Sequence, residues 1–293
     1  MTTTARPRRS VLYMPGSNPR ALEKAKSLAA DVLILDLEDA VAVDAKEEAR
    51  RLVGEAVQSS DYGARELVIR TNGLDTPWGR DDLVAAAAAG PDAVLLPKVE
   101  SVAMVKEAES VLMAAGVPDH TKIWCMMETP RGMLRAEEIA AASPRLACFV
   151  MGTSDLVKDL QASHTPLRLP VLTSLGLCLL AARAEGLAIL DGVYLDLNDA
   201  EGFQESCIQG LEMGFDGKTL IHPKQLAIAN EVFAPSAAEI DWSRRIIAAF
   251  EEAEAAGQGV VLVEGKLVEN LHVDNAKRLV ALSEAISALE TDA

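Results

Sequence analysis

Eight short apolar segments, each followed by a segment with helical periodicity, constrain the fold of this chain more than any other feature. Each ends at polar, Gly or Pro residues; they are 9–14, 32–37, 67–71, 93–97, 122–128, 147–152, 188–195 and 217–222. Runs such as DVLILD are apolar at almost every position, which is typical of parallel strands buried on both faces. The eight units therefore predict an α/β fold, a (β/α)₈ TIM barrel, with a doubly wound open sheet as the alternative.

Helical patterns lie between the predicted strands. Asn18 followed by Pro19 indicates an N-cap with Pro in the first turn. The expected barrel helices are 20–30, 44–57, 81–89, 101–113, 131–141, 171–184 and 201–213. Helices at 223–233, 236–256 and 273–289 follow, with a VVLV strand in 257–265. Because this tail exceeds what a barrel needs, we expect a barrel over 8–235 and a C-terminal helical extension over 236–293 that covers a neighbouring active site.

The composition excludes several classes of protein. The chain has 44 Asp and Glu against 28 Lys and Arg, a net charge of −16, which argues against a nucleic-acid partner. Its four cysteines form no C-x-x-C pair, so a reduced, cytoplasmic setting is expected. No apolar run is long enough to cross a membrane, and the N-terminus lacks a signal-peptide pattern, so no membrane partner is expected.

Polar residues follow nearly every predicted strand, and in a barrel the carboxyl ends of the strands converge on one face. Glu128 ends the fifth strand, and Asp155 follows the sixth. Two carboxylates with room for waters suit Mg²⁺, with Mn²⁺ as a second candidate, whereas no His/Cys cluster suits a softer metal. The alternative is that each carboxylate caps a helix or pairs with an arginine.

Other residues at this face have candidate roles. Glu38 and Asp39, with Asp36, follow strand two and are candidates for supporting metal-bound water or an arginine. Arg70 could bind a substrate carboxylate with two donors, or form a salt bridge with those acids.

Three further groups of residues belong to the same strand ends. The turn Gly152-Thr153-Ser154 could present backbone N–H groups to a substrate carboxylate. Strands seven and eight contribute Asp191 or Asp196 and His222, the last as an orienting or packing residue. Near the first helix, Arg20, Lys24 and Lys26 could bind phosphate, although solvated surface cations are the alternative.

Several motifs together resemble the HpcH/HpaI aldolase family in its citrate lyase beta-subunit-like, or CoA-ester lyase, branch. They are RSVLYMPGSNPRALEKA, DVLILDLEDAV, VIRTNG, LLPKVE, METPRG, GTSDL and GFDGKTLIHPKQ, and the similarity runs from Arg9 to about Lys277. LDTPWGR and LGLCLLAARAEGL look like the malyl-CoA lyases and (3S)-malyl-CoA thioesterases. The resemblance implies a Mg²⁺-dependent barrel of the phosphoenolpyruvate/pyruvate superfamily type that forms a homo-oligomer, a trimer or hexamer.

The resemblance also assigns roles to residues. Glu128 and Asp155 match metal ligands, Arg70 matches the binder of the substrate carboxylate, and Arg20 and Lys26 match positions that contact the phosphates of CoA. The segment EGKLVENLHVDNAKR matches one that closes over a neighbouring subunit, where the lyases carry an aspartate as a general acid. Glu269 stands at that position, which leaves carbon–carbon cleavage in doubt.

The implied substrate is a β-hydroxyacyl-CoA dicarboxylate of the malyl-CoA type. It would undergo thioester hydrolysis to malate and CoA, or retro-aldol cleavage to an acyl-CoA and a 2-oxo acid. Two alternatives remain open: a citrate lyase beta-like subunit that works on an acyl carrier partner, and a non-catalytic protein that binds CoA esters.

Overall fold

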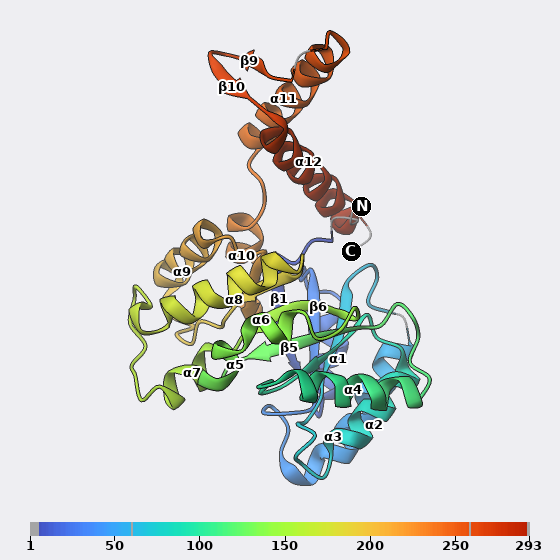
Figure 1. Ribbon diagram of the computed structural model, residues 1–293. Coiled ribbons are helices and arrows are strands. Elements are labelled where there is room, and N and C mark those ends of the chain that lie inside the picture. The colour runs from blue at the N-terminus through green and yellow to red at the C-terminus, as the bar shows by residue number, and fades with distance from the viewer. Residues whose placement is uncertain (1–5, 60, 258, 292–293) are drawn as a thin grey trace. The chain divides into compact units, whose positions relative to one another are not determined.

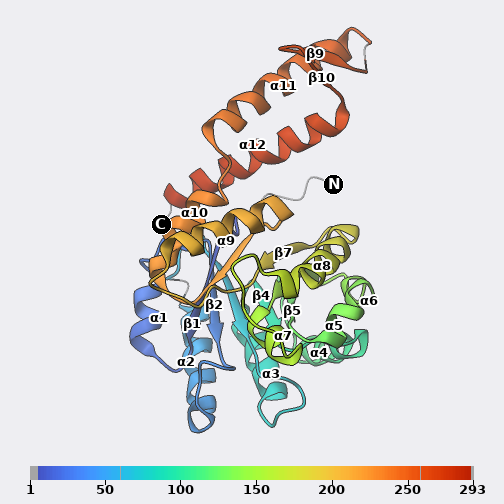
Figure 2. The ribbon, with the colours of Figure 1, turned by 90° about the vertical axis from the view of Figure 1, so that its left-hand side faces the viewer.

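The computed structural model describes residues 6–59, 61–257 and 259–291, and the chain divides into two compact units. One unit is Arg8–Phe233, and the other contains the chain from Ala234 onward. Each unit is described by itself below. In both views of the ribbon, helices surround the strands of the first unit (Figures 1 and 2).

The first unit is a closed parallel barrel in which the strands follow one another in chain order. Its strands are β1 Ser10–Pro15, β2 Val32–Asp36, β3 Glu66–Arg70, β4 Ala93–Leu96, β5 Lys122–Met127, β6 Leu146–Met151, β7 Ala188–Asp191 and β8 Gly217–Leu220. Pairing of Ser10 with Lys218 and of Leu12 with Leu220 joins β1 to β8 in parallel. The predicted barrel is confirmed, and the open sheet is excluded.

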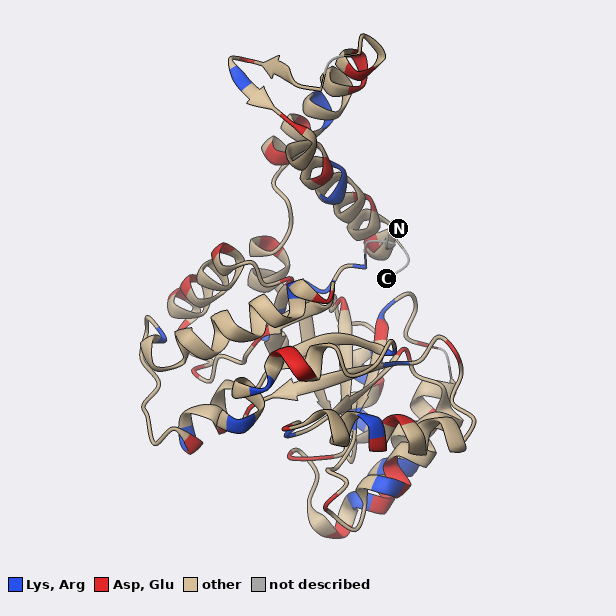
Figure 3. Cartoon of the chain, viewed as in Figure 1, with Lys and Arg blue, Asp and Glu red and all other residues tan. Residues whose placement is uncertain are grey.

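The helices of the barrel unit follow the strands as predicted, with differences in their limits. They are α1 Pro19–Ala25, α2 Lys46–Gln58, α3 Gly79–Ala89, α4 Val102–Ala114, α5 Pro130–Leu134, α6 Ala136–Ala140, α7 Thr153–Asp159, α8 Leu172–Ala184, α9 Ala200–Met213 and α10 Leu226–Val232. Short 3₁₀ turns are η1 Val43–Ala45, η2 Leu169–Val171 and η3 Pro223–Gln225. Acidic and basic residues alternate along α2 (Figure 3), where Arg51 pairs with Glu48 and Glu55.

Three of these limits correct the expectations from the sequence. The helix expected over 131–141 is two helices separated at Arg135, which has a non-helical φ of −118°. The strand expected over 188–195 ends at Asp191, and the next residue, Gly192, passes so close to Thr153 that a Cβ there would lie 2.5 Å from Thr153 Oγ1. The segment after β6, expected to be a turn, begins helix α7.

The core of this unit has two layers, as the alternation of side chains along each strand requires. One cluster fills the inside of the barrel; it includes Val11, Ile34, Val68, Leu95, Trp124, Val150 and Leu190. The larger cluster lies between the outer faces of the strands and the helices. Residues on the inner row of a strand therefore continue towards the mouth of the barrel, whereas those on the outer row pack under helices.

The second unit contains α11 Ala237–Ala255, the antiparallel hairpin β9 Val261–Val263 with β10 Lys266–Val268, and α12 Asn270–Thr291. Ser236 and Glu239 form a capping box at the start of α11. A small core holds the hairpin on the helices; it consists of Ile246, Phe250, Val263, Val268, Val273 and Ala276. Strand β10 was not expected from the sequence.

Within residues 6–59, 61–257 and 259–291, no helix has both the length and the apolar character needed to cross a membrane.

Candidate active site at the mouth of the barrel

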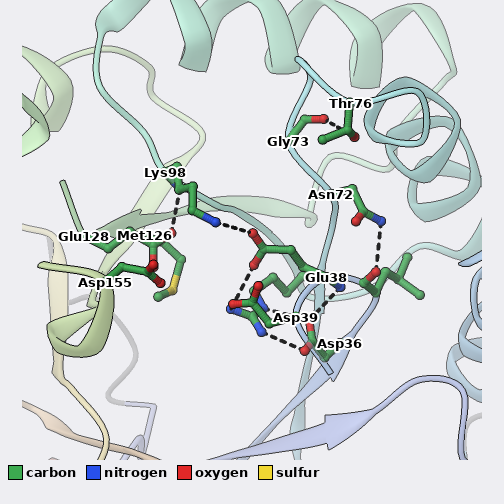
Figure 4. A network of polar contacts seen from close by, with 12 residues as sticks. Asp36, Glu38, Asp39, Asn72, Gly73, Thr76, Lys98, Met126, Glu128 and Asp155 are labelled. Carbon is green, nitrogen blue, oxygen red and sulfur yellow. Dashed lines mark hydrogen bonds and ion pairs between the residues drawn. The ribbon is translucent and has the colours of Figure 1, made fainter. Parts of the chain in front are cut away.

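Two acidic side chains lie side by side at the carboxyl end of the barrel (Figure 4). Glu128 directly follows β5, and Asp155 lies in the first turn of α7, directly after β6. Strands β5 and β6 are neighbours, so the fold brings the two residues to one place. Glu128 is 2% exposed, and the Asp155 side chain is 29% exposed. The pair thus has one buried member and one that solvent or a ligand can reach.

The position of Glu128 is fixed by the backbone around it. The amide of Lys98, directly after Pro97 at the end of β4, donates a 2.8 Å hydrogen bond to Glu128 Oε1. Lys98 adopts φ +49°, a left-handed conformation that non-glycine residues rarely take and that is found at functional sites. On the other side, a Cβ at Gly152 would lie 2.4 Å from both Cβ and Oε2 of Glu128. Only glycine leaves room for the carboxylate there.

Burial without a bound cation makes Glu128 hard to ionise. Desolvation raises its pKa to about 7; the Lys98 amide lowers the pKa, Glu38 and Asp155 raise it, and Arg70 lowers it. A divalent cation between Glu128 and Asp155 would relieve this cost. In the part of the chain that the structure describes, no three or more His, Cys, Asp or Glu side chains gather as a metal site. Two carboxylates that leave the remaining positions to water and substrate suit Mg²⁺.

Arg70 stands beside this pair and is 7% exposed. Its Nε and Nη2 donate to the two oxygens of Asp36 at 2.7 Å each, in the paired geometry that arginine and carboxylate favour. Its Nη1 lies 2.9 Å from Glu38 Oε2. The predicted salt bridge to the acids after β2 is therefore present, and those acids fix the plane of the guanidinium.

The carboxylates around Arg70 differ in their contacts. Glu38 also pairs with Lys98 Nζ at 3.1 Å, which links the arginine to the loop that holds Glu128 (Figure 4). Burial raises the pKa of Glu38, and Arg70 opposes the rise. Asp39 is more remote: its carboxylate lies 3.5 Å from Arg70 Nη1 and its side chain is 60% exposed. Sequence reasoning had assigned no role to Lys98, although its position after β4 placed it at this face.

The expected turn of Gly152, Thr153 and Ser154 is the start of α7, with Gly152 as its N-cap. Thr153 is buried and faces Gly192, and Asp155 lies on a different side of the same helical turn. The amide of Gly152 already donates to the carbonyl of Met127 at 2.9 Å. The amides of Thr153 and Ser154, in the first turn of the helix, have no partners within that helix, so they remain candidates for binding a substrate oxygen.

Of three other strand-end residues, Asp191 does not reach the mouth of the barrel. Asp191 was expected at the mouth, but it is fully buried and pairs with Lys218 and Arg168 at 2.7 Å each. It follows Leu190 of the inner row, so its side chain points under the helices. Asp196 is exposed and accepts from the amide of Asn198. His222 caps η3 by accepting from the Lys224 amide, which fits the orienting role expected for it.

Of the basic residues near β1, Arg20 and Lys24 lie on α1, and Lys26 is its C-cap. Asn18 caps the start of this helix as predicted, by accepting from the amides of Arg20 and Ala21. The Arg20 side chain is exposed. Lys26 pairs with Glu23 at 2.7 Å and with Asp61 at 3.3 Å. A phosphate on these residues would therefore compete with two carboxylates for Lys26.

Glu269 belongs to the second unit, between β10 and α12. Its amide donates to Nδ1 of His272, and its carbonyl accepts from the amide of the same residue. The part assigned to it on sequence similarity stays a prediction.

Comparisons with known proteins agree with the fold and the motifs. Residues 9–223 match the family described as HpcH/HpaI aldolase/citrate lyase. The chain is 58% identical over 288 residues to a (3S)-malyl-CoA thioesterase of Cereibacter sphaeroides, which covers 98% of this chain and 99% of that protein. It is 37% identical over 284 residues to the citrate lyase subunit beta of Escherichia coli, covering 95% and 94% of the two chains.

Solved structures give the same result. The crystal structure of CitE from Mycobacterium tuberculosis in complex with magnesium, acetoacetate and coenzyme A matches with a TM-score of 0.76 and 31% identity, covering 96% of this chain and all of that one. A citrate lyase beta subunit of the same organism complexed with oxaloacetate and magnesium matches with a TM-score of 0.68 and 33% identity, covering 80% of this chain. The resemblance read from the motifs is confirmed: the chain belongs to the HpcH/HpaI aldolase/citrate lyase family.

Proposed function

We propose that this chain is a Mg²⁺-dependent enzyme that hydrolyses a malyl-CoA-type thioester to malate and CoA. The observation that carries the proposal is the pair of Glu128 and Asp155, two candidate metal ligands, with Arg70, a candidate carboxylate binder, near enough to lower the pKa of Glu128. The relative that is 58% identical over nearly the whole chain carries the name of that activity, which favours hydrolysis over carbon–carbon cleavage.

The residues divide the work by their position. Glu128 and Asp155 would hold Mg²⁺, which when bound acts as a Lewis acid on substrate oxygens. Arg70 uses the N–H donors that Asp36 and Glu38 leave over to bind the substrate carboxylate, and those acids keep its guanidinium in one orientation. The Lys98 amide holds Glu128 through Oε1, so the carboxylate that would bind the metal has a fixed place. First-turn amides of α7, at Thr153 and Ser154, assist substrate binding.

The reaction on this site is a simple hydrolysis. The oxygen of water adds to the thioester carbonyl carbon, the carbon–sulfur bond breaks, and the thiolate of CoA takes a proton. Retro-aldol cleavage is the second candidate for the same substrate; the relatives named citrate lyase subunit beta, at 37–39% identity, favour it. Such a subunit could require an acyl carrier partner instead of free CoA.

One experiment separates these readings. The purified protein alone, with Mg²⁺ and malyl-CoA, is expected to release free thiol and malate, and EDTA should stop the release. Thiol appearance and chromatography of acyl-CoA species measure the two outcomes. Formation of acetyl-CoA and glyoxylate would show that the enzyme cleaves the substrate instead of hydrolysing it. The absence of both sets of products would overturn the proposed function for free CoA esters.

We also propose that the second unit covers the active site of a neighbouring copy in a homo-oligomer. Its exposed apolar side chains support this: Val260, Leu262, Leu267 and Leu271 are 48%, 69%, 53% and 63% exposed around the hairpin. Apolar groups gathered in this way are typical of surfaces that another chain covers. Glu269 lies in the same segment and would supply an acid to the neighbour.

Complementation between copies tests this arrangement. Variants Asp155→Ala and Glu269→Gln should each be inactive when alone. Co-expressed with different affinity tags and purified through both, they should regain turnover, because a neighbour then joins an intact barrel to an intact Glu269. Light scattering gives the number of copies. If the doubly tagged assembly is inactive, either Glu269 and Asp155 of one chain act in the same active site, or Glu269 does not belong to the active site.

Arg20 and Lys26 are proposed to contact the phosphates of CoA. Arg20→Ala should raise KM for malyl-CoA several-fold with little change in kcat, because a phosphate contact remote from the reacting atoms contributes equally to ground state and transition state. Arg80→Ala, a change of arginine on α3, serves as the control.

Glu269→Asp is expected to raise the ratio of cleavage to hydrolysis. The shorter side chain withdraws the carboxyl by about one methylene, and misplacement on the scale of 1 Å can change a rate on the order of 10²-fold. The ratio of acetyl-CoA to free CoA is the readout, with Glu264→Asp, in the hairpin that precedes Glu269, as the control. An unchanged ratio would show that Glu269 does not choose between the two reactions.

A further inference from the structure

Tyr13 lies on the inner row of β1 and reaches across the barrel. It packs against the cluster that contains Val11, two residues before it, so both face the interior. Its hydroxyl contacts Met126 Sδ at 3.3 Å, and Met126 belongs to β5. In a closed barrel of eight strands in chain order, β5 is diametrically opposite β1. The ring therefore spans the barrel just below the residues that end the strands.

The position of Tyr13 makes it the floor of the candidate site. The Arg70 guanidinium carbon lies 4.8 Å from the centre of its ring, a cation–π contact. Met126, at the other end of the tyrosine, comes two residues before Glu128 on the same strand end. The hydroxyl thus lies between the proposed carboxylate binder and the proposed metal pair, and Tyr13 is not fully buried.

The hydroxyl of Tyr13 has a poor partner. The chain has three tyrosines. The hydroxyl of Tyr62 donates to the carbonyl of Leu22 at 3.1 Å, and that of Tyr194 donates to Asp199 Oδ2 at 2.5 Å. Tyr13 alone donates to a thioether sulfur, which is a weak acceptor. Tyrosines in the interior normally donate their hydroxyl hydrogen to a good acceptor. The Tyr13 hydroxyl is therefore available to donate to an oxygen of a bound ligand.

The charges around Arg70 explain why a neutral donor is needed there. Asp36 and Glu38 already balance the guanidinium, with Asp39 beyond them. The neighbouring carboxylates therefore already neutralise much of the charge of the arginine that a substrate carboxylate would contact. Burial raises the pKa of Tyr13, and the neighbouring acids Glu128, Asp36 and Glu38 raise it further against the opposing effect of Arg70, so the phenol keeps its proton.

We infer that Tyr13 is a further substrate-binding residue: its hydroxyl donates a hydrogen bond to the substrate carboxylate that Arg70 binds, and exchanges the sulfur of Met126 for a carboxylate oxygen. This inference rests on the proposed function, because it assigns the second donor for the same carboxylate. The inference also explains the cation–π contact, because packing of the Arg70 guanidinium on the Tyr13 ring keeps the guanidinium and the hydroxyl on the same side of the bound carboxylate.

Tyr13→Phe tests the inference, because it removes only the hydroxyl and keeps the ring under Arg70. A hydrogen bond to a charged group is worth about 1.5–3 kcal/mol, so kcat/KM for malyl-CoA should fall roughly 10- to 100-fold. Calorimetric titration of Mg²⁺-loaded protein with malate should show a similar loss of affinity. Binding of Mg²⁺ alone should not change. Tyr62→Phe removes a buried hydroxyl far from the site and should leave turnover and malate binding as in the wild type.

The outcomes are separable. If Tyr13→Phe binds malate as tightly as the wild type, the hydroxyl does not contact the carboxylate and the inference is wrong. A lower melting temperature with unchanged malate affinity would likewise reduce Tyr13 to a packing residue. If the wild type binds malate but does not turn over malyl-CoA, the proposed function fails; a weaker malate affinity in Tyr13→Phe would still support the contact.

Discussion

Two clusters of buried charge stand at strand ends of the same barrel, and they differ in what they leave available. Around Arg70, the acids Asp36 and Glu38 hold the guanidinium at the mouth. The carboxylates Glu128 and Asp155 lie at the same mouth (Figure 4). Around Asp191, both carboxylate oxygens accept from Arg168 Nη1, and one also accepts from Lys218 Nζ. The first cluster faces the opening, and the second is sealed between strands and helices.

The difference follows from whether the residue lies on the inner or the outer row of its strand. Arg70 comes two residues after Val68 of the inner row, whereas Asp191 comes one residue after Leu190 of that row. Alternation therefore sends Arg70 to the mouth and Asp191 under α9, where Gly210 makes room for it. A buried charge at a strand end does not by itself mark a functional site. The side chain must also lie on the inner row, which leads to the mouth of the barrel.

Loss of Asp155 should have the largest effect on activity. Asp155→Ala removes one of two proposed metal ligands, and metal-ion catalysis is worth several kcal/mol, so Mg²⁺-dependent turnover should fall on the order of 10³-fold or more. Asp159→Ala changes an acid of the same helix, at its last residue, and should keep full activity. Wild-type kcat for Asp155→Ala at saturating Mg²⁺ would refute the ligand assignment.

Loss of Asp191 should act on stability and leave the metal site intact. Asp191→Ala leaves the buried Lys218 without its anion, and breaking a buried pair in this way typically costs about 3–5 kcal/mol. Urea denaturation measures the loss, and Mg²⁺ titration of the folded variant should give the wild-type affinity. Glu48→Ala removes a surface partner of Arg51 and should change stability little. If Asp191→Ala were stable but unable to bind Mg²⁺, the comparison between the two clusters would collapse.

Much of the barrel and part of the site could be predicted from the sequence. Continuous apolar runs such as 32–35 and 67–69 identify buried parallel strands, and strand order alone brings Glu128 next to Asp155. The expected strand over 188–195 runs four residues beyond the end of β7, so Asp191 is not recognised as its last residue, with a side chain that points away from the mouth. A short helix such as α7 also escapes a periodicity search, since Gly152 gives it no side-chain cap.

Contacts that depend on the closure of the barrel could not be read from the chain. The contact between Tyr13 and Met126 joins opposite strands, and the tilt of the strands sets which residues meet. The left-handed backbone of Lys98 is equally hidden, because a lysine gives no sign of positive φ. Both features lie where the site is built, which is where local rules of sequence fail most often.

Gly152→Ala should weaken the metal site without changing any ligand. The added methyl group would overlap both Cβ and Oε2 of Glu128, so the carboxylate must move away from its bond with the Lys98 amide. Displacement of one ligand of two should lower Mg²⁺ affinity roughly 10- to 100-fold, as losses around metal ligands generally do. Gly176→Ala adds the same group in α8, where nothing lies within 4 Å, and should be neutral. Equal Mg²⁺ affinities in the two variants would mean that Glu128 needs no such space.

The smallest effect is a dependence of the metal site on pH. Because burial raises the pKa of Glu128 to about 7 in the metal-free protein, a proton competes with Mg²⁺ for the carboxylate below that pH. Mg²⁺ affinity should fall about tenfold per pH unit below 7 and level off above it. Linkage gives the matching sign for stability: the folded protein holds this proton more tightly than the unfolded chain, so metal-free stability should decline as pH rises from about 4.5 to 7. Saturating Mg²⁺ should cancel this decline in stability, and Glu128→Gln should lack it. A decline that persists in Glu128→Gln would show that another group titrates and that the pH dependence does not arise at the mouth of the barrel.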